Sequence, residues 1–158
     1  MKVRRLGLLQ LVTAVFAVAA FALAGTVEAA RNPDADQGGR RLTATLLGSN
    51  EIAGGDLDGS GGVVVTLNQG QGVVCFELTT TGIATPTRAH IHQGPAGVNG
   101  AIVVDLLNNN TTEGPLSGCL ANVDPDLIKD IRQNPDQYYF NVHNADFPGG
   151  ALRGQLTK

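Results

Sequence analysis

Short runs of β-branched, aliphatic and aromatic residues, separated by glycine-rich turns, most constrain the fold of this chain. Apolar and polar residues alternate within several runs, as in Arg88-Ala89-His90-Ile91-His92-Gln93. A period of two is typical of a β-strand with one buried face, because successive side chains point to opposite sides. We predict strands at residues 42–47, 63–68, 73–79, 88–93, 101–107, 138–143 and 151–157.

One segment has the pattern of a helix instead. Asp124 can cap it, Pro125 suits its first turn and Pro135 ends it, while Leu127, Ile128 and Ile131 form a narrow apolar stripe. We therefore predict an all-β fold, an antiparallel β-sandwich or flattened barrel of about 7–8 strands with one short helix.

Two segments are predicted to be loops. Residues 108–118 are polar, and residues 48–62 are rich in glycine. Within the second, Asp56-x-Asp58-Gly59 resembles a fragment of a calcium-binding loop, but Leu67 stands where an acidic twelfth ligand would be required. We favour an ordinary turn there.

The N-terminus has the pattern of an export signal. Lys2, Arg4 and Arg5 precede an apolar stretch, and small residues offer cleavage after Ala24 or Ala29. We predict a signal peptide at residues 1–29 and a flexible leader at residues 30–40; the alternative is an uncleaved membrane anchor. Removal of residues 1–29 changes the net charge from −3 to −5 and leaves no basic run, so we expect neither nucleic acid nor a membrane surface as partner.

The two cysteines, Cys75 and Cys119, are expected to form a disulfide if the protein is exported. Two buried thiols or two thiolate metal ligands are the alternatives. Their spacing matches no CxxC motif of zinc or redox proteins.

All three histidines fall on the polar sides of predicted strands. His90 and His92 point away from Ile91, and His143 shares a side with Asn141, opposite Phe140 and Val142. If the strands are neighbours, these side chains gather on one outer surface with Arg153 and Asp105, partly covered by the loops at 94–100 and 144–150.

This cluster has two interpretations. It forms a hydrogen-bonded polar network, or His90, His92 and His143 hold copper or zinc through three nitrogen ligands. Arg153, Asp105 and Asn141 would support the site, with a fourth position left open or taken by Asp105 or Asp146. No Gly-x-Ser-x-Gly or phosphate-binding glycine loop is present, so we assign no catalytic residue.

Several segments resemble the CHRD domain family, named after repeats in chordin. They are Leu47 to Glu51, His90 to Gly100, Asp124-Pro125 with its helix, and Tyr138 to Leu156. The resemblance implies a CHRD domain at residues 41–157, a secreted or periplasmic β-rich module without a settled biochemical activity. A looser similarity runs to copper/zinc superoxide dismutases, which use more histidine ligands than three and a basic residue, for which Arg153 is the candidate.

We therefore expect an exported, non-enzymatic β-sandwich module that binds an extracytoplasmic protein or surface partner. The alternative is a copper- or zinc-binding protein, related in function to superoxide dismutase, with His90, His92 and His143 as ligands.

Overall fold

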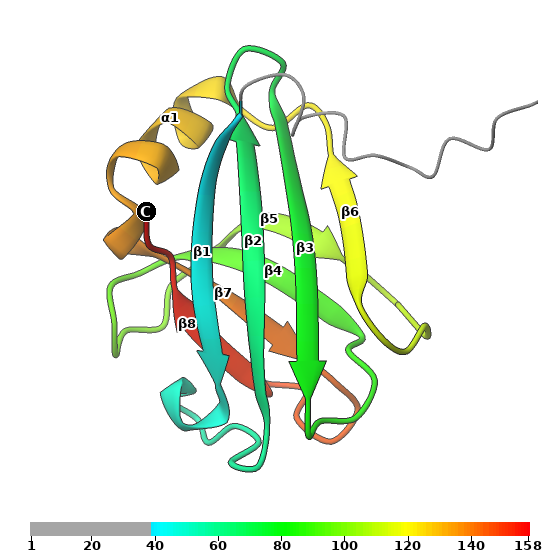
Figure 1. Cartoon of the computed structure of the whole chain (residues 1–158). Helices are drawn as coiled ribbons and strands as arrows, with labels where there is room; N and C mark the ends of the chain where they lie inside the picture. Colours follow the sequence, from blue (N-terminus) through cyan, green and yellow to red (C-terminus); the bar gives the residue numbers. More distant parts are fainter. Residues whose placement is uncertain (1–38) are drawn as a thin grey trace, which may run out of the picture.

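Eight strands form one antiparallel sheet that curls into two packed layers (Figure 1). The computed structural model describes residues 39–158. The predicted signal peptide lies outside these residues, as does almost all of the predicted leader. Within residues 39–158 no helix has the length and apolar character that a bilayer crossing requires.

The strands run in the spatial order β5-β4-β7-β8-β1-β2-β3-β6, and every pairing is antiparallel. Their bounds are β1 Arg40–Leu47, β2 Ser60–Asn68, β3 Val73–Thr81, β4 Arg88–Gln93, β5 Ile102–Leu107, β6 Leu116–Leu120, β7 Tyr138–His143 and β8 Leu152–Gln155. Strands β5, β4, β7 and β8 make one layer, and β1, β2, β3 and β6 make the other (Figure 1). The predicted all-β sandwich or flattened barrel is confirmed.

The core lies between the layers and is built from the apolar side of each strand. In β1, Leu42, Ala44 and Leu46 are buried while the residues between them are exposed. Phe76 of β3 and Phe140 of β7 meet across the core, with ring centroids 6.4 Å apart. The alternation that predicted these strands is thus the alternation between core and outer face.

The helix α1, Pro125–Gln133, forms as predicted and lies at one end of the sandwich (Figure 1). The carboxylate of Asp124 accepts a hydrogen bond from the Asp126 backbone N–H at 2.9 Å, which caps the first turn. Ile128 and Ile131 are fully buried against the sheet. Two short 3-10 turns, η1 Gly48–Asn50 and η2 Pro135–Gln137, complete the regular structure of the described residues.

Strand β6 was missed by the sequence analysis, which assigned residues 108–118 to a loop. It pairs with β3 and places Cys119 directly opposite Cys75. Its residues, Leu-Ser-Gly-Cys-Leu, include a glycine and no β-branched side chain, so strand propensity gives little signal. By contrast, the predicted turn at Asp56 is confirmed: the Gly59 N–H donates to the Asp56 carbonyl at 3.0 Å.

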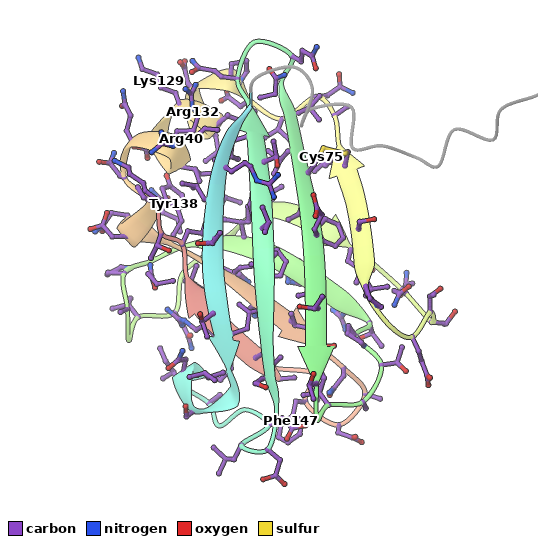
Figure 2. All side chains as sticks on the ribbon, in the orientation of Figure 1. Arg40, Cys75, Lys129, Arg132, Tyr138 and Phe147 are labelled. Atoms are coloured by element: carbon purple, nitrogen blue, oxygen red, sulfur yellow. A yellow bond between two sulfur atoms is a disulfide. The ribbon has the colours of Figure 1, made fainter. Side chains whose placement is uncertain are left out.

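The predicted disulfide between Cys75 and Cys119 is present and ties the edge strand β6 to β3. The bond closes a loop over a sequence separation of 44 residues, which constrains the unfolded chain. Figure 2 labels Cys75 on its strand beside β6.

We expect the double variant Cys75→Ala/Cys119→Ala to lose about 4 kcal/mol of unfolding free energy, the loop-entropy value for a closed loop of this length. Guanidinium denaturation measures the loss. Ser117→Ala, on the same strand and exposed, is the control and should change stability by less than about 0.5 kcal/mol. A loss below about 1 kcal/mol in the double variant would contradict the expectation.

Candidate metal centre

The strand register collects the predicted site residues into one row on the outer face of the β5-β4-β7-β8 layer. His90 pairs with Asp105 of β5 on one side and with Asn141 of β7 on the other. Asn141 in turn pairs with Arg153 of β8. His92 lies two residues along β4, opposite Tyr139, and His143 lies two residues along β7, opposite Arg88. Four neighbouring strands therefore present these side chains on one face.

The three histidines form one cluster. A ligand nitrogen from each of His90, His92 and His143 lies within 4.8 Å of the other two. The side chains are only 4%, 9% and 8% exposed, respectively. The histidines lie on the predicted outer face of the sheet. They are more deeply buried than the sequence analysis expected, because loops cover that face.

Two backbone carbonyls fix which ring nitrogens carry hydrogen. His92 Nδ1 lies 2.9 Å from the Gly100 oxygen, and His143 Nδ1 lies 2.9 Å from the Pro148 oxygen. A carbonyl can only accept, so each Nδ1 must donate. In the neutral rings the Nε2 atoms of His92 and His143 are then bare acceptors.

Asn141 lies between these two bare nitrogens and cannot satisfy both. Its Nδ2 is 2.9 Å from His143 Nε2, whereas its Oδ1 is 3.1 Å from His92 Nε2. Turning the amide round moves the acceptor–acceptor contact from His92 to His143 without removing it. The network therefore lacks one positive charge, which either an additional proton or a metal ion would supply.

His90 completes the same pattern. Its Nδ1 is 3.0 Å from His143 Nε2, and its Nε2 faces Asp105 Oδ1 at 3.7 Å. No backbone carbonyl fixes the tautomer of His90. A proton on Nδ1 would donate to His143 Nε2, whereas a proton on Nε2, on the side of Asp105, would leave Nδ1 bare. With the second tautomer all three rings turn a lone pair inward, the arrangement that outer partners impose on metal-binding histidines.

Burial disfavours an additional proton on His90 and on His143. It lowers the pKa of His90, reinforced by the neighbouring His143 and opposed by the Asp105 carboxylate. Burial also lowers the pKa of His143, against the hydrogen bond to the Pro148 carbonyl, which raises it.

Arg153 anchors the loop that covers the cluster. Its guanidinium donates to the carbonyls of Pro95 and Val98 at 3.2 and 2.7 Å and to Asn99 Oδ1 at 3.1 Å. It also stacks on the Tyr139 ring, with Cζ 3.4 Å from the centroid. Because it is buried and held by the loop, Arg153 does not suit the role of guiding a diffusing anion.

Tyr139 links this anchor to the histidines. Its ring stacks on His92 with centroids 4.7 Å apart, and its hydroxyl accepts from the Gly100 N–H at 3.2 Å. Gly100 is the residue whose carbonyl sets the tautomer of His92. The loop, the aromatic ring and the imidazole therefore hold one another in place.

Glu51 belongs to this neighbourhood, although the sequence analysis gave it no role in the site. Burial raises the pKa of its carboxyl, opposed by the charge of Arg153 and a hydrogen bond from Asn141. Its buried Oε1 has no hydrogen-bond partner among the described residues. A Cβ at Gly150 would clash with that oxygen, so a larger residue there would displace the carboxylate from its present position. Glu51 lies in a glycine-rich loop, where the sequence has no strand or helix periodicity that could mark a site residue.

Asp105 and Asp146 were the two carboxylates expected near a fourth ligand position, and only Asp105 lies close to a histidine. Asp105 contacts His90 but lies outside the three-nitrogen cluster, and Asp146 is exposed.

We expect the metal-free protein to lose stability as the pH falls below about 6.5. The pKa values of His90 and His143 are lower in the folded chain than their ordinary value of 6.5, so the unfolded chain binds more protons in that window. Denaturation at pH 7.5 and 5.0, in chelator, measures the loss, and His143→Gln should reduce its dependence on pH.

Glu51, whose pKa is raised, acts in the opposite direction, because its protonation at lower pH favours the folded chain. The decisive quantity is therefore the difference in pH dependence between wild type and His143→Gln, which share Glu51. Parallel pH profiles would contradict this account of the cluster.

A family model for the CHRD domain matches residues 42–156, which is most of the chain. No curated protein and no solved structure matches it.

Proposed function

Because the chain belongs to the CHRD domain family, we propose that it is an exported β-sandwich module that binds a transition-metal ion, copper or zinc, through His90, His92 and His143. The observation that carries the proposal is the pair of carbonyl contacts that hold hydrogen on the outward nitrogens of His92 and His143. They leave imidazole lone pairs turned toward a common centre, and imidazole is a preferred ligand of both metals.

The donor set fits such an ion. Nitrogens about 2.0–2.1 Å from one ion lie at most about 4.2 Å from one another. His90 Nδ1 and His143 Nε2 are already 3.0 Å apart, and the cluster as a whole spans 4.8 Å. A tetrahedral pair lies only about 3.4 Å apart, so the most separated ring would have to approach by roughly 0.6–1.4 Å, depending on the geometry, with Asn141 turned aside or supplying Oδ1.

Each residue then has a distinct part. The three rings hold the ion, the carbonyls of Gly100 and Pro148 orient two of them, and Asp105 orients the third. Arg153 keeps the covering loop closed through its three hydrogen bonds. A bound copper ion would supply redox chemistry and a bound zinc ion a fixed positive charge.

Export is supported by the disulfide, since such bonds persist in oxidising compartments, and by the family, whose domains are of extracellular type. The extracytoplasmic protein or surface partner expected from the sequence remains a prediction.

We expect stoichiometric binding of Cu(II) or Zn(II) by the metal-free protein and a loss of affinity of about 100-fold or more in His90→Ala and His143→Ala. Asp105→Asn, which changes only an outer partner, should weaken binding by about 10–100-fold. Isothermal titration calorimetry measures each affinity, and Gln93→Ala, an exposed neighbour on β4, is the control. Unchanged isotherms in both histidine variants would refute the proposal.

We expect the protein recovered from outside the cytoplasm of its host to begin at Gly25 or Ala30, the residues that follow the two predicted cleavage sites. N-terminal sequencing or intact mass identifies the first residue. A chain that retains Met1 and sediments with membranes would favour the uncleaved anchor.

A further inference from the structure

A second polar site lies at the end of the sandwich that carries α1 and shares no residue with the histidine cluster. It is a pocket of about 440 Å³, which we call the basic pocket. Figure 2 shows Arg40, Lys129 and Arg132 grouped beside the helix. The lining residues are Arg40, Gln69, Lys129, Arg132, Gln133 and Lys158.

The pocket concentrates positive charge in an acidic chain. Four of the seven lysine and arginine residues in the described part of the chain line it, and no carboxylate side chain does. They come from the start of β1, from α1 and from the chain's last residue, so no basic run marks the site in the sequence.

None of these four cations has an ion pair within residues 39–158, where the single recorded pair is His90–Asp105. The helical carboxylate of Asp130 accepts hydrogen bonds from the Tyr138 hydroxyl at 2.5 Å and from Asn134 Nδ2 at 2.6 Å. Asp126, one turn before Lys129, forms no ion pair with it. The four cations therefore have no direct carboxylate partner among the described residues.

The guanidinium of Arg132 is only partly hydrogen-bonded. One terminal nitrogen donates to Gln69 Oε1 at 2.9 Å, but its Nε is buried and has no partner. A buried donor without an acceptor is costly, so Gln69 alone does not satisfy this guanidinium. Arg132 also stands in the last turn of α1, where a cation suits the helix dipole, but that accounts for one of the four charges and not for the buried donor.

We propose that the basic pocket binds a multivalent oxyanion of the phosphate or sulfate class. The guanidinium of Arg132 would provide the directional donors, Lys129, Arg40 and Lys158 the surrounding charge, and the amides of Gln69 and Gln133 further hydrogen bonds. The pocket volume is large enough to hold a compact anionic group.

Calorimetric titration with inorganic pyrophosphate tests the proposal, on the full metal-free protein at low ionic strength. We expect saturable binding that weakens at least 10-fold in Lys129→Gln/Arg132→Gln and that falls with added salt. Arg41→Gln/Arg88→Gln makes the same change in net charge at exposed residues outside the pocket and should bind as wild type does.

Equal weakening in both double variants, or no saturable binding by wild type, would overturn the proposal. If the Arg132 variant does not fold, Lys129→Gln/Lys158→Gln, at two exposed positions, replaces it. Parallel titrations with sulfate and with phosphatidylglycerol vesicles identify the source of the anion. Binding to vesicles alone would overturn a small-anion site.

Discussion

The apolar side of strands β4 and β7 determines what lies on the opposite side. Ile91, Phe140 and Val142 are fully buried in the core, and the strand period then sends the histidines, Asn141 and Tyr139 outward. The antiparallel register adds Asp105 and Arg153 to the same row. A shift of either strand by one residue would exchange core and site together, so the packing energy of the core also specifies the site.

The covering loops turn this row of polar groups into a buried centre. Their carbonyls orient His92 and His143, and Arg153 holds one loop in place while stacking on Tyr139. Backbone groups, unlike side chains, cannot change protonation, so the resulting tautomers are imposed by the fold. The unsatisfied contact at Asn141 is therefore a property of the architecture and not of one rotamer.

Alternation predicted most of the strands and the side of its strand on which each of the three rings lies, because alternation reports directly which face of a strand is buried. It did not predict that β4 and β7 are neighbours, which brings the rings together. Strand β6 could not, because its short Leu-Ser-Gly-Cys-Leu segment is fixed by pairing with β3 and by the disulfide. Glu51 and the basic pocket were missed for a related reason. Both depend on loops and chain ends brought together in space, which no local pattern records.

The sheet does not close, since β5 and β6 stand at its two ends. Each border is poorly suited to accept a strand from another molecule. Strand β5 has an irregular register with β4, and β6 is five residues long, contains a glycine and is held covalently to β3. Exposed edges otherwise invite pairing with a strand of another molecule, and these irregularities disfavour such pairing at both borders.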